Sequence, residues 1–214
     1  MNKDTTRMNT LALASHGPVI PVIVIHNLDD AVPMAQALVD GGVKVLEITL
    51  RTPVALKCME AIARAVPSAI VGAGTIRTVA DAQAARDVGC VVGVSPGYTS
   101  NIGTYCRNIG LPLLPGVSTG SEVMQANADG YDFLKFFPAT AAGGIPMLKA
   151  LAGPFPDVMF CPTGGITVET APQFLSLANV KVCGGSWLTP NDAVAAKDWA
   201  RITKLAKEAG ALRP

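Results

Sequence analysis

The sequence is poor in the side chains from which metal centres are built. It has two histidines in 214 residues, His16 and His26, and its five cysteines are widely scattered with no Cys-x-x-Cys pair. Zinc and non-haem iron sites need close groups of histidine, cysteine and carboxylate, so we expect no metal site. Free buried thiols in a reducing compartment are favoured over disulfides for Cys58, Cys90, Cys106, Cys161 and Cys183.

The sequence also lacks a charge bias and a long apolar run. Lys and Arg number 17 against 16 Asp and Glu, and no basic run suggests a nucleic-acid surface. Every hydrophobic run is interrupted before the roughly 18 residues of a membrane span. The opening "MNKDTTRMNT" is not followed by the apolar segment and cleavage site of a signal peptide. We therefore expect a soluble cytoplasmic protein whose partner is a small molecule, with no nucleic acid or membrane involved.

What the sequence does contain is a regular alternation of short apolar runs with longer segments of helical period. The runs recur at roughly 20 to 25 residues, the length of one strand-helix unit, which predicts parallel strands and right-handed crossovers. Eight such units favour a single (β/α)8 barrel over residues 1–214. A doubly wound open sheet is the alternative. The strand candidates are 19–25, 43–50, 69–75, 91–96, 111–117, 132–137, 158–165 and 180–187.

Three helical segments carry recognisable end signals. Residues 1–18, with "TLALASHG", predict an extra N-terminal helix that caps the bottom of the barrel. In 29–42, Asp29 is a candidate N-cap, and in "GGIPMLKALAGP" Pro146 suits a first helical turn. Residues 191–210 predict one last helix.

Polar side chains gather at the carboxyl ends of the predicted strands, where barrels of this type place their active sites. In "VLEITLRT", Glu47, Thr49 and Arg51 share one face of the strand, and the alternating face is uniformly apolar. The polar face is therefore expected to point toward the barrel axis. Further strand ends offer Thr75, Ser95, Pro96 and Lys135.

Lys135 is the most unusual of these residues, because it lies inside the apolar run "YDFLKFFPAT". It shares parity with Phe133 and Phe137, so it faces the interior if Leu134 and Phe136 face the helices. A position among aromatic rings would desolvate the ammonium and favour a neutral, nucleophilic amine, as Schiff-base chemistry with a carbonyl substrate requires. The alternative is a lysine that snorkels to solvent from an edge strand.

Glu47 and Arg51 suit the same chemistry. A carboxylate near an iminium can carry protons to and from the substrate, and a guanidinium fork can hold the carboxylate of a 2-oxo acid. The alternatives are a buried Glu47 that is simply paired with Arg51 or Lys135, and an Arg51 in a structural ion pair.

Two glycine pairs follow the last two strand candidates, in "TGGI" and "GGSW". Bare backbone N–H groups there can converge on an anion at a helix N-terminus, and barrels often hold a phosphate at these two positions. Either pair alone could equally be an ordinary turn. Together they predict a phosphate site.

The sequence resembles the 2-keto-3-deoxy-6-phosphogluconate (KDPG) aldolases, also called 4-hydroxy-2-oxoglutarate (KHG) aldolases, over nearly its whole length. Strings such as "EITLRT", "KFFPA" and "CPTGGI" in this order carry the resemblance. It implies a homotrimeric (β/α)8 barrel of the Entner-Doudoroff pathway, a class I aldolase that needs no metal or other cofactor. Such an enzyme cleaves the sugar acid phosphate to pyruvate and glyceraldehyde 3-phosphate, and 4-hydroxy-2-oxoglutarate to pyruvate and glyoxylate.

The resemblance also implies roles for individual residues. Lys135 would be the Schiff-base lysine and Glu47 the proton carrier. The pyruvate end would be bound by Arg51, Thr75, Pro96 and Phe137. Thr163 would affect stereochemical choice at C4 and favours the gluconate-type substrate. The phosphate would be held by Gly164, Gly165, Gly184, Gly185 and Ser186.

Two departures from the family pattern touch none of these residues. Many members have glutamate where this chain has Thr140, and "GTIR" replaces the commoner "GTV" continuation. Two other readings of the site stay open. One is a phosphate-binding barrel of another reaction type, such as an epimerase or synthase, which would need paired carboxylates or metal ligands. The other is a non-catalytic sugar-phosphate sensor.

Overall fold

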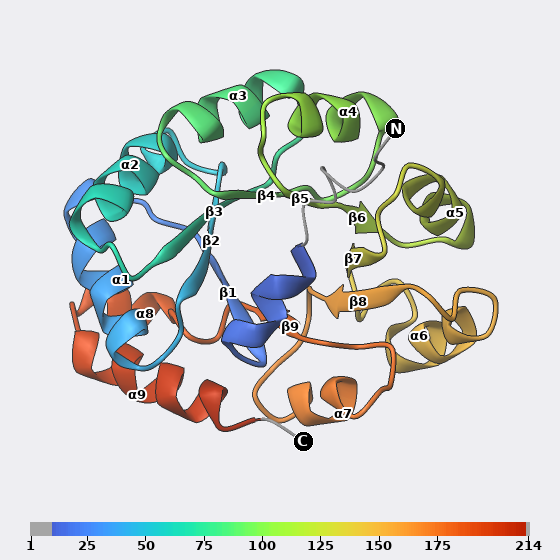
Figure 1. The fold of residues 1–214 in the computed structure, drawn as a ribbon. Coiled ribbons are helices and arrows are strands. Elements are labelled where there is room, and N and C mark those ends of the chain that lie inside the picture. Colours follow the sequence, from blue (N-terminus) through green and yellow to red (C-terminus); the bar gives the residue numbers. More distant parts are fainter. Residues whose placement is uncertain (1–9, 213–214) are drawn as a thin grey trace.

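The computed structural model describes residues 10–212, in which short strands alternate with helices around a ring. Figure 1 shows the ring viewed along its central axis, with the strands inside and the helices outside. All strand pairs are parallel, so the α/β architecture predicted from the alternation is confirmed. The strands are β1 (Val19–Ile23), β2 (Val45–Thr49), β3 (Ile70–Gly74), β4 (Val92–Val94), β5 (Leu113–Leu114), β6 (Gly116–Val117), β7 (Phe133–Phe136), β8 (Met159–Pro162) and β9 (Cys183–Gly185).

Helices follow the strands along the chain and cover their outer side. Leu46 and Ile48 of β2 pack in one buried cluster with Met59 and Ile62, and Leu134 and other outward residues form a second cluster. Across residues 10–212, none of the helices combines the length and the apolar composition that a membrane-spanning helix needs. The α-helices are α1 (Ala31–Asp40), α2 (Ala55–Ala65), α3 (Val79–Asp87), α4 (Ser100–Asn108), α5 (Gly120–Ala128), α6 (Gly144–Ala152), α7 (Ala171–Leu175), α8 (Asn191–Ala195) and α9 (Trp199–Gly210).

The strands form two hydrogen-bonded sheets rather than one closed eight-stranded sheet. The larger has the order β5-β4-β3-β2-β1-β9 and the smaller the order β6-β7-β8. Pro115, which has no backbone N–H, divides the predicted strand 111–117 into β5, paired with β4, and β6, paired with β7. On the other side, β8 is linked to the segment of β9 by the isolated bridges Phe160–Val180 and Thr163–Gly184.

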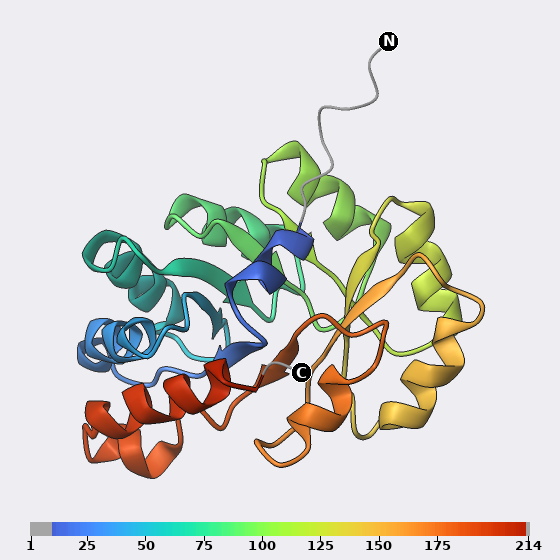
Figure 2. The same ribbon diagram turned by 60° about the horizontal axis from the view of Figure 1, so that its bottom comes forward.

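The ring is filled by a third apolar cluster that includes Ile20, Val45 and Phe133, at or near the starts of their strands. Against it pack Leu11 and Leu13 of the 3-10 helix η1 (Thr10–His16), which lies across this end of the ring (Figures 1 and 2). The helix expected over 1–18 is therefore a short 3-10 helix, and residues 1–9 of that expectation lie outside the described ranges.

Two details of the helices differ from the prediction. Asp29 is not the N-cap of α1, because it belongs to the 3-10 helix η2 (Leu28–Asp30), where its N–H donates to Asn27 Oδ1 at 3.1 Å. The helix expected over 191–210 is two helices, α8 and α9. The chain turns between them at Lys197, whose φ is +52°, and the Asp198 side chain caps α9 by accepting from the Arg201 N–H.

Candidate active site

Lys135 lies on β7 with its side chain inside the ring. Its strand neighbours Leu134 and Phe136 pack toward the helices, whereas Phe133 belongs to the interior cluster. The alternation predicted from the sequence is therefore present, and Lys135 is only 3% exposed. The alternative of a snorkelling lysine on an exposed edge is wrong.

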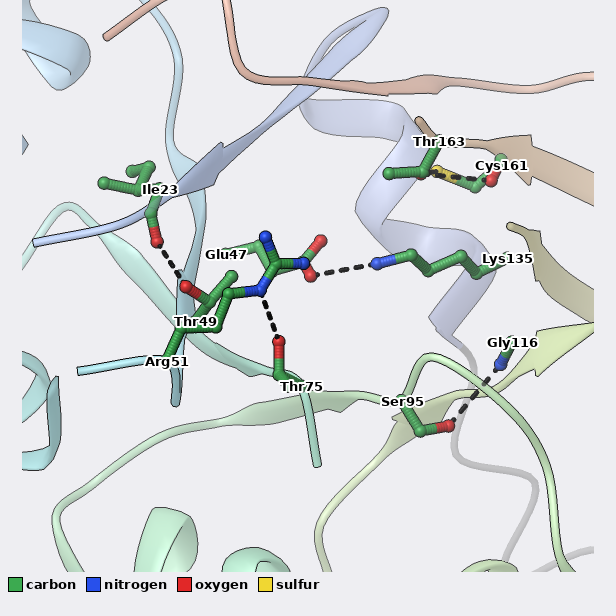
Figure 3. A network of polar contacts seen from close by, with 10 residues as sticks. All are labelled: Ile23, Glu47, Thr49, Arg51, Thr75, Ser95, Gly116, Lys135, Cys161 and Thr163. Atoms are coloured by element: carbon green, nitrogen blue, oxygen red, sulfur yellow. Dashed lines mark hydrogen bonds and ion pairs between the residues drawn. The ribbon is translucent and has the colours of Figure 1, made fainter. Parts of the chain in front are cut away.

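Glu47 reaches Lys135 from the other sheet. It lies on β2, and its Oε1 is 3.1 Å from Lys135 Nζ (Figure 3). Both side chains are 4% exposed. A buried charge without a partner costs several kcal/mol, so each of these groups needs the other. The contact is the ion pair considered as one alternative for Glu47, and it is also the geometry that direct proton transfer requires.

One of the aromatic residues flanking Lys135 lies close to its amine. The Phe137 ring centroid lies 5.1 Å from Lys135 Nζ, within cation–π distance. Burial disfavours the ammonium, but the Phe137 ring and the Glu47 carboxylate both stabilise it. Lys135 Nζ thus lies between an aromatic ring and a carboxylate that is close enough to exchange a proton with it directly.

Arg51 and Thr75 meet at the carboxyl ends of β2 and β3. Arg51 Nε donates to Thr75 Oγ1 at 3.3 Å (Figure 3). Thr75 has a left-handed φ of +66°, an unfavourable conformation for a β-branched residue. Within residues 10–212, no carboxylate lies at ion-pair distance from Arg51, so its terminal nitrogens have no acidic partner there. The structural ion pair considered for Arg51 is absent from this part of the chain.

Most of the predicted site residues surround one pocket of about 120 Å³. Glu47 and Thr75 do not line the pocket themselves. Glu47 contacts Lys135 and Thr75 contacts Arg51, and both of these partners line the pocket. Pro96 is also outside the lining and packs against Gly116 of β6. A larger hollow of about 320 Å³, between η1 and the ends of α1 and α9, contains none of the predicted site residues. The 120 Å³ pocket is lined by Val22, Arg51, Lys135, Phe137, Thr163, Gly164, Gly165, Ile166, Gly184, Gly185 and Ser186.

The two glycine pairs lie together on one side of this pocket, linked by the Thr163–Gly184 bridge. Gly164 and Gly165 have φ of +102° and +76°, conformations that favour glycine. Neither pair stands at a helix N-terminus, because turns separate them from α7 and α8, so that part of the expectation is wrong. Within residues 10–212, the N–H groups of Gly165 and Ile166 donate to no other group of the protein.

Val22 and Ile166 were missed by the sequence reasoning. Val22 is paired in register with Glu47, so the strand alternation that identified Glu47 could also have found it. Ile166 follows the second glycine of "TGGI" and carried no such signal. Thr140 lies beside the same loop, where its N–H donates to Gly164 O and its side chain packs against Gly165.

The cysteines of the chain are free and buried, as expected. Cys161 is paired in register with Lys135, and its Sγ lies 3.8 Å from Thr163 Oγ1. Burial raises the pKa of the Cys161 thiol to about 12, so the thiol stays protonated at neutral pH. In residues 10–212, His, Cys, Asp and Glu side chains form no group of three that could hold a metal ion.

Comparison with known proteins decides the family. Residues 12–205 match the family described as KDPG and KHG aldolase. The chain belongs to this family. It is 50% identical over 195 residues to the 2-dehydro-3-deoxy-phosphogluconate aldolase of Pseudoalteromonas atlantica, with 91% of each chain covered. It is 49% identical over 198 residues to the KHG/KDPG aldolase of Escherichia coli K12, with 92% of this chain and 93% of that one covered.

A solved family structure has the same fold. The KDPG aldolase of Legionella pneumophila superposes with a TM-score of 0.91 at 46% identity, covering 94% of this chain and 97% of that chain. That structure contains pyruvate captured at low pH as a covalent carbinolamine intermediate. The family resemblance inferred from the sequence is thus confirmed.

Proposed function

We propose that the chain is a class I aldolase that cleaves 2-dehydro-3-deoxy-6-phosphogluconate to pyruvate and glyceraldehyde 3-phosphate. The observation that carries this proposal is the buried contact between Lys135 and Glu47 at a pocket that also presents Arg51. Relatives named for this activity are 50% and 49% identical to the chain and support it. The proposed reaction belongs to the Entner-Doudoroff pathway and uses no metal or other cofactor.

The first half of the reaction makes the electron sink. Glu47 takes a proton from the Lys135 ammonium across their 3.1 Å contact, and the neutral amine attacks the C2 carbonyl of the substrate. Proton transfer within the adduct gives a carbinolamine. Glu47 returns its proton to the C2 hydroxyl, which leaves as water, and an iminium forms.

The second half breaks the carbon–carbon bond. Glu47 takes the C4 hydroxyl proton while the C3–C4 electron pair moves toward the iminium, which releases the aldehyde and leaves an enamine. Glu47 then gives the proton to C3 of the enamine, and water hydrolyses the resulting iminium to pyruvate and free Lys135. One carboxylate can serve all these steps because each leaves it in the protonation state that the next requires.

The remaining residues are assigned to binding. Arg51 holds the substrate carboxylate with two parallel hydrogen bonds, and the Thr75 hydroxyl lies beside it. Phe137 forms the wall next to Lys135 Nζ, and Pro96 supports the pyruvate end from the loop after β4. Thr163 faces the C4 region and affects the choice of stereochemistry there.

The phosphate is assigned to the glycine side of the pocket. Free N–H groups at Gly165 and Ile166 and the Ser186 hydroxyl are donors of the kind that phosphate oxygens accept. The phosphate-binding residues in this proposal are Gly164, Gly165, Gly184, Gly185 and Ser186, and the N–H of Ile166 adds a further donor. The unphosphorylated 4-hydroxy-2-oxoglutarate would be cleaved to pyruvate and glyoxylate without contacting the glycine side of the pocket.

We also propose the assembly. The whole chain, residues 1–214, would form one domain that works as a closed (β/α)8 barrel with an N-terminal helix, in a cytoplasmic homotrimer. Pro115 alone separates β5 from β6, and the two bridges link β8 to β9, which supports closure. Sedimentation equilibrium of the whole chain tests the trimer, for which three times the chain mass is expected.

A coupled assay for pyruvate release tests the reaction. Purified protein should release one pyruvate for each sugar acid phosphate consumed. A sugar-phosphate sensor would release none, while the same ligand would still raise its melting temperature. An epimerase or synthase would consume or isomerise the ligand without pyruvate.

A further inference from the structure

Gly74, the last residue of β3, lies directly against the carboxylate of Glu47. A Cβ atom built at Gly74 would lie 2.5 Å from Glu47 Oε1, 2.7 Å from its Cγ and 3.0 Å from its Cδ. Non-bonded carbon atoms rest at about 3.5 to 4.0 Å, so the side chain of any other residue at this position would overlap Glu47.

The backbone does not explain why position 74 is glycine. Gly74 does not have the positive φ that favours glycine, and its strand is regularly paired with Glu47 opposite Gly72 and Thr49 opposite Gly74. An alanine could adopt the same backbone conformation. The requirement for glycine therefore comes from the space that the Glu47 side chain occupies.

Few contacts hold the Glu47 carboxylate in place. Among residues 10–212, its only hydrogen-bond or ion-pair partner is Lys135 Nζ. Gly74 provides the surface on the side of the same oxygen, Oε1. The Glu47 carboxylate therefore lies between the backbone of Gly74 and the amine of Lys135. The contact with Gly74 limits how far the carboxylate can move toward β3, away from the amine.

We infer that Gly74 is a positioning residue for the proton carrier Glu47, keeping its carboxylate within transfer distance of Lys135 Nζ. This inference rests on the proposed function, which assigns the proton transfers to Glu47. It extends the site to a residue without a side chain, whose contribution is the space that it leaves for the Glu47 carboxylate.

Gly72 provides a matched control on the same strand. A Cβ there would lie 2.8 Å from a Val92 methyl carbon, so it would meet a side chain of the core rather than the carboxylate. Both positions point to the same side of β3 because they are two residues apart. Gly74→Ala and Gly72→Ala therefore place the same methyl group on the same strand, and only the first meets Glu47.

The test measures kcat and the exchange of pyruvate methyl protons with deuterated water, which reports protonation at C3. Gly74→Ala is expected to lower both by about 10²-fold or more, the scale of general acid-base catalysis, and Gly72→Ala by less than about threefold. KM for the sugar acid phosphate should change little in either variant, because Arg51 and the glycine loops are untouched.

A double-substitution cycle separates positioning from general damage. In a Glu47→Ala background the carboxylate is gone, so Gly74→Ala should lower the residual exchange no further and should shift the melting temperature by no more than about 2 °C. If Gly74→Ala alone prevents folding, restored folding in this double variant supports the inference, and continued failure to fold overturns it.

The inference is also overturned if Gly74→Ala retains the wild-type rates, or if it costs as much in the Glu47→Ala background as in the wild type. If the wild-type protein releases no pyruvate, the proposed function is wrong. That result differs from the results that overturn the inference about Gly74, so the two can be told apart.

Discussion

Lys135 Nζ and Glu47 Oε1 lie 3.1 Å apart, although their residues are 88 positions apart in the chain and belong to different sheets. Each side chain is 4% exposed, so neither charge is solvated by bulk water. The two groups therefore depend on each other, because within residues 10–212 each is the only ion-pair partner of the other. Substitutions at this pair and at the groups around its pocket should have separable effects.

Replacement of Glu47 by glutamine should remove the proton carrier while keeping its shape. We expect kcat to fall by about 10²- to 10⁴-fold, the usual contribution of a positioned general acid-base group. KM should change less, since the Glu47→Gln substitution leaves the Arg51 and glycine contacts in place. Steady-state kinetics with the sugar acid phosphate measure this, and a kcat within about threefold of wild type would show that Glu47 is not the carrier.

Replacement of Arg51 by lysine should weaken the binding of every 2-oxo acid to the same extent. Lysine keeps the charge but cannot make two parallel hydrogen bonds, and a hydrogen bond to a charged group is worth about 1.5 to 3 kcal/mol. We expect the Kd of pyruvate and the KM of both aldol substrates to rise by roughly tenfold to hundredfold. An increase confined to the phosphorylated substrate would place Arg51 at the wrong end of the pocket.

Replacement of Gly165 by alanine should affect only the phosphorylated substrate. Gly165 has a φ of +76°, and an added Cβ would lie 2.6 Å from Thr140 Oγ1, so the loop has to move. We expect KM for the sugar acid phosphate to rise by about tenfold, the loss of one charge-assisted hydrogen bond, with KM for 4-hydroxy-2-oxoglutarate unchanged.

Gly130→Ala is the control for that variant. Gly130 has a φ of +90°, but a Cβ there would meet no atom within 4 Å, so the substitution has backbone strain without the loop contact. Its ratio of the two KM values should equal that of the wild type. An equal rise for both substrates in Gly165→Ala would argue against a phosphate site at this loop.

The buried thiols should make the protein less stable at alkaline pH. Burial raises the pKa of Cys90 and of Cys161 to about 12, above the value of 9.0 for a free thiol. Between pH 9 and 12 the unfolded chain therefore loses thiol protons that the folded chain keeps, so the free energy of unfolding should fall as the pH rises.

Denaturant titrations at about pH 8 and about pH 10.5 measure this fall. Below about pH 9 both states are protonated at these thiols, so their contribution is complete and constant. At the lower pH, a thiol reagent should modify the cysteines only after denaturation. A free energy of unfolding that rises between the two pH values, or rapid modification of the native protein, would contradict the burial of these groups.

Much of the fold could be predicted because local signals agree with the tertiary arrangement. Each of the eight strand candidates contains a strand, since short apolar runs bounded by glycine and proline have few alternatives. The division at Pro115 could have been anticipated from its missing N–H. The turn at Lys197 could not, because nothing in "AAKDW" other than the capping Asp198 signals an end to the helix.

The site was predictable to the extent that strand alternation decides which side chains face inward. Lys135, Glu47 and Arg51 were found by that rule, the glycine pairs by their positions after the last two strands, and Phe137 and Thr163 only by the family resemblance. The distance between the two groups could not be predicted, because it depends on how two sheets curve toward each other. The role of Gly74 was also hidden, since a glycine carries no side chain whose chemistry could draw attention.

Borohydride trapping shows whether Lys135 forms a Schiff base with the carbonyl of a 2-oxo acid. Pyruvate and borohydride are added to the native protein, and the adduct is located by peptide mass spectrometry. We predict one reduced pyruvate adduct for each chain, on Lys135, and none in Lys135→Arg. An adduct on another lysine, or a wild-type protein that releases pyruvate without any adduct, would show that Lys135 is not the Schiff-base residue.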